Sequence, residues 1–227
     1  MLIDLHLKCP PERRYTWLRA SAQAGLDAVC LVGDGGRLPD QEAARAALPR
    51  EGLMLFFGAE FRLQRGSLVL IPADLAGFES ECSARRPTEY DEVLEVARRT
   101  GAAVIAGHPY DRSAGPSFAD GVFQLEGLHA IEVVNGNRSE VASRLALEAA
   151  MRLHLAAVGG TGPANSPSAV GPAATVFAQS PNDQAALVEA IRCGKVFPVE
   201  LGTLDRRPEA PRRAQRPRPR PQAEEKP

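Results

Sequence analysis

The sequence contains no apolar run approaching the roughly 20 residues that an α-helix needs to cross a bilayer. Its first residues, Met1-Leu2-Ile3-Asp4, place an acid where a secretory signal carries basic residues. We therefore expect a cytoplasmic protein with no membrane partner. Cysteine is also scarce, because the chain has four, widely spread and without a CxxC pair. That spacing gives little support to a disulfide framework or a structural zinc site and favours buried free thiols.

No internal repeat of fixed period is visible along the 227 residues. The composition is 44% hydrophobic and 24% charged, which is near the average for globular chains and allows most of the chain to bury a core. The length fits one substantial domain without requiring a second core.

Short apolar runs alternate with helical stretches as far as residue 199. The predicted strands cover residues 2–6, 28–32, 53–57, 68–71, 102–106, 130–134 and 155–158. One predicted helix begins after residue 10, and the others cover about 41–48, 88–100, 139–153 and 182–193. Such alternation predicts a parallel sheet, either open and doubly wound or closed into a barrel. The pattern alone leaves both open.

The alternation ends after Leu204. Residues 206–227 hold seven Arg and one Lys against three Glu, a net charge of +5, so the remainder carries −6. Because Arg and Pro cannot build a core, we expect a single domain over 1–204 and a disordered Arg/Pro-rich tail over 205–227. The tail has no aromatic residue for stacking on bases, which favours a solubilising end or nonspecific contact with nucleic acid or protein.

Several short motifs fall at the predicted carboxyl ends of the strands, where active sites of barrel enzymes lie. They are Asp4-Leu5-His6-Leu7-Lys8, Gly25–Asp34, Gly58-Ala59-Glu60, Ala106-Gly107-His108-Pro109, Ile131-Glu132-Val133-Val134-Asn135 and Gly160-Thr161-Gly162-Pro163-Ala164-Asn165. In this order they resemble the motifs of the PHP (polymerase and histidinol phosphatase) domain family. The resemblance spans most of residues 1–200.

This resemblance implies an α/β fold, a distorted parallel β/α barrel related to the TIM barrel. Active members resemble one another in hydrolysing phosphoesters with a cluster of up to three metal ions. The family pattern implies His6, Glu60 and His108 as metal ligands, and Asp34 stands where the family has a further His. Two imidazoles and a carboxylate suffice to hold one Zn²⁺ or Mn²⁺, to which Asp34 would add an oxygen ligand.

Other positions of the family pattern have lost their metal ligands. Lys8 stands in place of the second His of the opening motif, and the late motif over 160–165 has neither its Asp nor its His. A protonated ammonium repels a cation, so we expect Lys8 to pair with Asp34 or Glu60 and to replace the charge of a metal.

Two functions remain open on these residues. In the first, the chain is a catalytically degenerate PHP-like domain, a pseudoenzyme that serves as a binding or regulatory module. In the second, it is a metal-dependent phosphoric ester hydrolase that acts on a phosphate monoester or nucleotide with one or two Zn or Mn ions. The lost ligands favour the first, and no catalytic residue is assigned.

A small phosphorylated ligand is compatible with either function. Arg112 follows His108-Pro109 on a predicted loop and is a candidate anion contact, although a solvated arginine is the plainer interpretation. His129 and His154 lie in apolar segments without partners in sequence. We expect them to have packing or surface roles.

Overall fold

The computed structural model describes residues 1–49, 52–113, 115–136 and 139–201. The predicted tail over 205–227 and the predicted domain boundary at 204 lie outside the described residues. Among the described residues, no helix combines the length and the apolarity needed to span a membrane. Of the four free cysteines, Cys30 and Cys82 are buried, Cys9 is partly buried and Cys193 is exposed.

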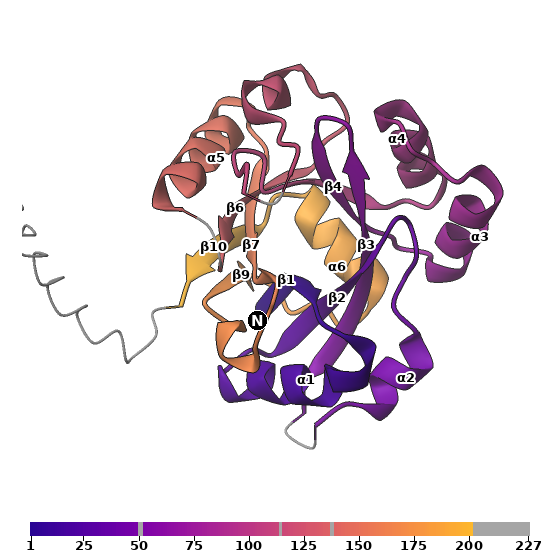
Figure 1. The fold of residues 1–227 in the computed structure, drawn as a ribbon, viewed down its shortest axis with the longest axis vertical. Helices are drawn as coiled ribbons and strands as arrows, with labels where there is room; N and C mark the ends of the chain where they lie inside the picture. Colours follow the sequence, from indigo (N-terminus) through magenta and orange to yellow (C-terminus); the bar gives the residue numbers. More distant parts are fainter. Residues whose placement is uncertain (50–51, 114, 137–138, 202–227) are drawn as a thin grey trace, which may run out of the picture.

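One sheet curves into a nearly closed barrel, and helices surround it (Figure 1). The strands are β1 (Leu2–Lys8), β2 (Ala28–Asp34), β3 (Met54–Leu63), β4 (Gly66–Ile71), β5 (Ala103–Gly107), β6 (Ala130–Asn135), β7 (Ala156–Gly160), β8 (Gly162–Pro163), β9 (Ala173–Phe177) and β10 (Val196–Glu200). The helices are α1 (Arg14–Gln23), α2 (Gln41–Ala46), α3 (Leu75–Arg85), α4 (Tyr90–Arg99), α5 (Glu140–Arg152) and α6 (Gln184–Arg192), with 3-10 turns η1 (Pro11–Arg13), η2 (Ala119–Gln124) and η3 (Pro167–Ala169). The predicted α/β barrel class is confirmed.

The sheet is mixed rather than wholly parallel. Its strand order is β10-β9-β1-β2-β3-β4-β5-β6-β7, with β8 beside β1. Strand β4 runs antiparallel to both β3 and β5, and β9 runs antiparallel to both β1 and β10. Only Gln64 and Arg65 separate β3 from β4, and so short a connection permits a hairpin but not a parallel crossover.

The sequence did not predict helix α3, the strands β8, β9 and β10, or the 3-10 turns η2 and η3. Strand β10 is partly exposed and contains Pro198, a residue that argues against a strand in sequence patterns but is tolerated at a sheet edge. Helix α3 contains Gly77, which weakens a helical pattern, yet the side chain of Asp74 caps its first turn by accepting from Gly77 N–H at 3.0 Å.

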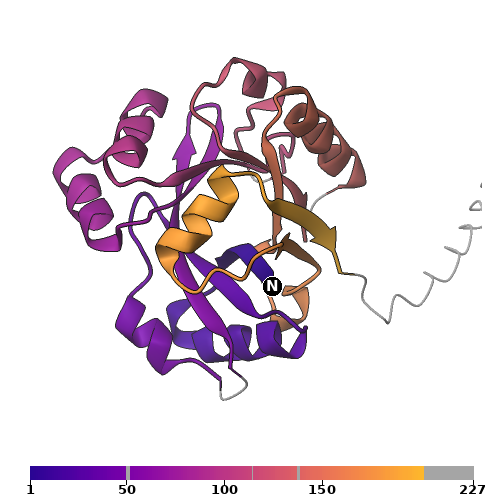
Figure 2. The same cartoon turned by 180° about the vertical axis from the view of Figure 1, so that it is seen from behind.

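Side chains alternate between the barrel interior and the surrounding helices. On β5, Ala103 and Ile105 join the interior cluster, which also contains Leu187 and Ile191 of α6. Figure 2 shows α6 crossing the opening that the strands frame. The Gln184 side chain anchors this helix, because it donates to Phe57 O at 2.7 Å and accepts from Phe57 N–H at 3.1 Å.

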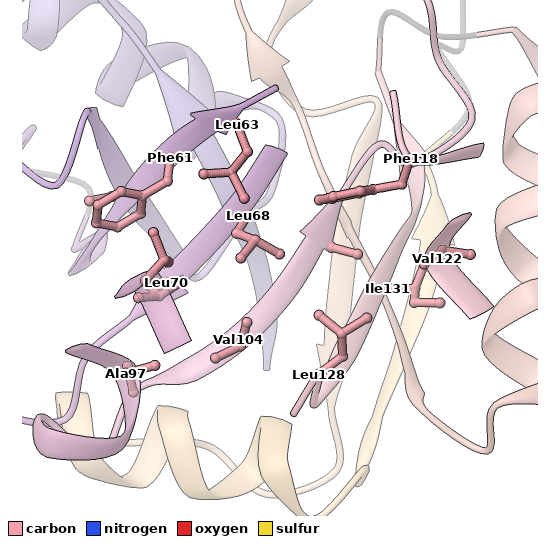
Figure 3. Packing of buried hydrophobic residues seen from close by; sticks show 14 of the residues in the cluster. Phe61, Leu63, Leu68, Leu70, Ala97, Val104, Phe118, Val122, Leu128 and Ile131 are labelled. Carbon is pink, nitrogen blue, oxygen red and sulfur yellow. The ribbon is translucent and has the colours of Figure 1, made fainter. Parts of the chain in front are cut away.

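A second cluster lies between the sheet and the outer helices. Figure 3 shows part of it, with Leu68, Val104 and Ile131 of three adjacent strands directed to one side. Each of these side chains is almost completely buried, and such burial stabilises the fold by about 1.5–3 kcal/mol for a side chain of this type. The alternation leaves Glu132 on the opposite face of β6 from Ile131, toward the interior.

Two strands are irregular where the polar motifs lie. The register of β1 against β2 shifts between Asp4 and Leu7, and that of β6 against β7 shifts between Glu132 and Val134. Such irregularities change the direction in which a side chain points and are common beside functional sites. Here they flank His6 and Glu132.

Candidate functional site at the barrel mouth

Polar side chains converge where β1, β2, β3, β5 and β6 end. His6, Glu60 and His108, which the sequence predicted as ligand positions, are all nearly excluded from solvent. The rings of His6 and His108 lie parallel, with an interplanar angle of 10° and centroids 6.1 Å apart. The Nε2 of His108 is 3.3 Å from Oε1 of Glu60. The fold therefore brings these three residues together, while their function stays a prediction.

Lys8 lies in the same cluster and contacts both carboxylates proposed as its partners. Its ammonium donates to Oε2 of Glu60 at 2.6 Å and also to Oδ1 of Asp34. The Lys8 side chain is only 11% exposed, whereas that of Asp34 is 70% exposed. Burial by itself would raise the pKa of Glu60, but the hydrogen bond of His108 and the charges of His6 and Lys8 bring it well below its usual value.

Glu132 is the centre of a second set of contacts that the sequence analysis did not assign to the site. Its carboxylate accepts from Nδ1 of His6 at 3.1 Å, from the His108 N–H at 3.0 Å and from Nδ2 of Asn135 at 2.9 Å. The signal in the sequence was an acid between apolar residues in a predicted buried strand, Ile131-Glu132-Val133. A buried carboxylate of that kind requires partners.

His6 and Glu132 form a buried ion pair. Burial disfavours the charged form of each group, but their mutual attraction and hydrogen bond outweigh it, so the pKa of Glu132 is lowered and that of His6 is raised. Glu132 also fixes the backbone of His108, whose φ of 33° is uncommon for a residue with a side chain. A strained conformation of this kind costs of order 1–3 kcal/mol and persists where surrounding contacts hold it.

Asp4 lies on β1 next to the cluster and is fully buried. Its Oδ1 accepts from the N–H groups of His6 and Thr161, at 3.0 and 2.9 Å. Burial raises the pKa of Asp4. Among the described residues, Asp4 Oδ2 and His6 Nε2 are buried without a hydrogen-bond partner. Gly160 makes this packing feasible, because a Cβ there would lie 2.6 Å from the His6 nitrogen.

A pocket of about 400 Å³ opens beside Lys8 and Asp34, and Arg14 of α1 also lines it. Arg14 is only 6% exposed. Its Nη1 reaches the Asp40 carbonyl at a long 3.4 Å, its Nε has no partner, and no carboxylate of the described residues forms an ion pair with it. The sequence analysis missed Arg14, since nothing in a helix-starting Arg-Tyr-Thr-Trp indicates burial.

The other predicted residues lie apart from these contacts. Arg112 is exposed on the loop after β5 and is not among the residues that line the mouth pocket. His129 has a structural contact, because its Nδ1 accepts from the Val104 N–H at 3.0 Å. His154 is exposed just after α5.

The metal cluster that the family pattern implies does not fit the residues present. The carboxylates of Asp34 and Glu60 both accept hydrogen bonds from Lys8. The late motif has Gly160-Thr161-Gly162, which carries no metal-binding side chain of the Asp or His type. Across residues 1–49, 52–113, 115–136 and 139–201, no three His, Cys, Asp or Glu side chains are arranged to hold a metal ion. An ammonium between the two carboxylates supplies positive charge where a cation would.

The fold and the strand-end cluster define a β/α-barrel domain of the kind that carries its site at the mouth. The PHP-associated family model matches residues 141–196, from α5 to the start of β10. No curated protein sequence matches the chain.

Solved structures share this fold at low sequence identity. PsfC from Pseudomonas syringae superposes with a TM-score of 0.64 at 20% identity, covering 88% of this chain and 91% of that one. A protein assigned as a metal-dependent phosphoesterase from Bifidobacterium adolescentis has a TM-score of 0.53 at 16% identity, covering 70% and 86%. An amidohydrolase from Chromobacterium violaceum, with sulfate and no metal, has a TM-score of 0.51 at 14% identity, covering 74% and 89%.

The match over residues 141–196 agrees with the resemblance of the strand-end motifs to the PHP family, and the solved structures share the barrel fold.

Proposed function

We propose that this chain is a metal-independent binding module built on the PHP barrel, which holds a small ligand with a phosphate or carboxylate group at the barrel mouth. The observation that carries the proposal is the contact of one ammonium, that of Lys8, with both Asp34 and Glu60. A divalent cation needs the same carboxylate oxygens. Lys8 therefore competes with metal for its own ligands.

Displacing Lys8 is costly. The ammonium and the Glu60 carboxylate are both largely buried, and removing one partner of a buried ion pair costs about 3–5 kcal/mol. A metal that entered would also lie close to the displaced ammonium. This arrangement supports loss of metal-dependent hydrolysis rather than a reduced form of it.

Arg14 supports the nature of the ligand. A buried guanidinium without a carboxylate partner is unfavourable, and a bound oxyanion would satisfy it with parallel hydrogen bonds. Among the described residues, the charged groups that line the pocket are Lys8, Arg14 and Asp34. Because Lys8 is engaged with Asp34 and Glu60, the guanidinium of Arg14 is the charge available to the ligand. Pro10, Pro11, Pro39 and Pro163 also line it, and their restricted backbones reduce the entropy lost on binding.

The test is binding of inorganic phosphate and of acetate by isothermal titration calorimetry after EDTA treatment. We expect at least one of the two anions to bind saturably and Arg14→Gln to weaken it about tenfold or more. Arg19→Gln is the matched control, because Arg19 lies exposed on the same helix. Absence of saturable binding of both anions, or equal affinity in Arg14→Gln and Arg19→Gln, would refute the proposal.

One observation favours the competing function, a phosphoesterase with one or two metal ions. The Nε2 of His6 is buried without a partner among the described residues, as a nitrogen awaiting a ligand would be. Turnover of p-nitrophenyl phosphate that requires Mn²⁺ or Zn²⁺ and is lost in Glu60→Ala would establish that enzyme and displace the binding module. We expect no such turnover.

A further inference from the structure

A second cavity, of about 610 Å³, lies beside the turn that follows β2. Three segments far apart in the sequence form it: the turn over 35–37, the end of β3 over 61–63, and the end of α3 with the connection to α4 over 82–88. Each contributes one guanidinium, from Arg37, Arg62 and Arg86. We call this cavity the arginine cleft. None of the described residues that line it is acidic.

The carboxylates nearest in sequence to the cleft are already engaged. Lys8 binds Asp34 and Glu60, so the 3.8 Å approach of Arg62 Nε to Glu60 adds little. Glu92 accepts from the N–H groups of Thr88 and Glu89, at 2.9 and 3.2 Å. Glu81, which precedes Cys82, pairs with Arg85 and lies 3.8 Å from Nε of Arg99. Within the described part of the chain, Arg37 and Arg86 form no ion pair, so their charges are available to an anionic ligand.

The thiol in the cleft does not offset this charge. Cys82 lines the cavity, and burial, with the nearby Glu81 and Glu79, raises the pKa of its thiol to about 11. The thiol is therefore neutral at physiological pH. Ser83 and Thr88 line the same cavity. The Thr88 hydroxyl donates to Glu92, and the Ser83 hydroxyl is a further hydrogen-bond donor for an anion.

The backbone at Arg86 is held in a conformation that its side chain disfavours. Arg86 ends α3 with φ 48° and ψ 56°, the left-handed region in which glycine is usual at a helix end. Strained backbone of this kind is concentrated at functional sites, so the conformation of Arg86 supports a function of its side chain. Gly36 lets the turn after β2 pack against the other two segments, because a Cβ there would lie 2.8 Å from the Phe61 ring and 3.1 Å from the Cys82 sulfur.

We propose that the arginine cleft binds a small ligand carrying two or more phosphate groups, at a site separate from the mouth pocket. Arginine forks bind phosphate oxygens with paired hydrogen bonds, and three forks exceed what one phosphate needs. The volume lies within the roughly 300–1,000 Å³ of small-molecule sites. A single-stranded nucleic acid fits less well, because the aromatic residue of the cleft, Phe61, is 2% exposed and offers no stacking face.

The experiment measures pyrophosphate binding to the full chain by isothermal titration calorimetry at low ionic strength. We expect Arg37→Gln, Arg62→Gln and Arg86→Gln each to weaken binding about tenfold or more, the loss typical of one charge-assisted hydrogen bond. Arg85→Gln is the matched control, because Arg85 pairs with Glu81 and does not line the cleft. Equal affinity in all four variants, or no saturable binding to the wild type, would overturn the proposal.

Two further measurements separate binding from folding and from the mouth pocket. Arg86→Gly should raise the thermal midpoint by roughly 2–4 °C, because it relieves the left-handed strain, while it weakens pyrophosphate binding. Arg14→Gln, which alters the mouth pocket and not the cleft, should leave the affinity for pyrophosphate unchanged. Loss of pyrophosphate binding in Arg14→Gln, or a cleft that binds an oligonucleotide but not pyrophosphate, would contradict the assignment.

Discussion

The Nζ of Lys8 and the Oε2 of Glu60 are 2.6 Å apart at the mouth of the barrel, where both side chains are largely withdrawn from solvent. The same carboxylate lies 3.3 Å from His108 through its other oxygen. Glu60 thus contacts the Lys8 ammonium through one oxygen and the imidazole of His108 through the other. The consequences are measurable in stability as well as in binding.

Removing the Lys8 charge should destabilise the fold. We expect Lys8→Met to lower the free energy of unfolding by about 3–5 kcal/mol, because it leaves the Glu60 carboxylate buried without that partner. The double variant Lys8→Met, Glu60→Gln should be less destabilised than the sum of the two single variants. Urea unfolding measures both, and Lys195→Met, an exposed lysine, is the control. Strict additivity would show that the pair is not coupled.

The pH dependence of stability should report the lowered pKa of Glu60. A carboxyl group whose pKa is lower in the folded state stabilises the fold above its unfolded value, here 4.5, and this contribution is lost as pH falls toward the folded value. Unfolding free energy should therefore decrease below about pH 4.5 in the wild type. We expect a shallower decrease in Glu60→Gln. Parallel curves for the two proteins would contradict this assignment.

Gly160 should tolerate no side chain. A Cβ at this residue would lie 2.6 Å from the His6 nitrogen and 2.9 Å from Asp4 Oδ1, so Gly160→Ala should cost about 1–3 kcal/mol of stability. Gly121→Ala is the matched control, because among the described residues its added Cβ would meet no atom within 4 Å beyond its own helix and chain neighbours. Equal thermal midpoints of the two variants would mean that the backbone at Gly160 moves freely.

Chelation should leave the fold unchanged. Because Lys8 already neutralises the carboxylates that a cation would use, we expect the thermal midpoint to be the same before and after EDTA treatment. Elemental analysis of protein purified without chelator should find less than a full metal cluster. A large drop in the midpoint on EDTA treatment, restored by Mn²⁺ or Zn²⁺, would contradict the proposed role of Lys8.

Much of the barrel and part of its mouth were predictable from local patterns. Apolar runs such as 28–32 and 102–106 mark buried strands wherever they occur, and parallel strand ends meet at one edge. This geometry and the PHP resemblance placed His6, Glu60 and His108 at one edge and predicted that Lys8 pairs with Asp34 or Glu60. The fold brings Lys8 to both carboxylates. The strand at 68–71 was predicted, but its antiparallel direction was not. A strand's direction depends on the length of its connection, here Gln64 and Arg65, and not on the strand's own residues.

Tertiary structure alone decided which charged groups are buried and what they contact. Glu132 meets His6 from 126 residues away, at strands whose register shifts are invisible in the apolar pattern. Arg14 is buried and the arginine cleft is formed because the path of the chain brings separate segments together. Hydrophobic periodicity is a local property of the sequence, so it determined the alternating strands and helices, and the motif resemblance added the barrel. The environment of a charge depends on distant residues, so only the folded chain decided the electrostatics of the sites.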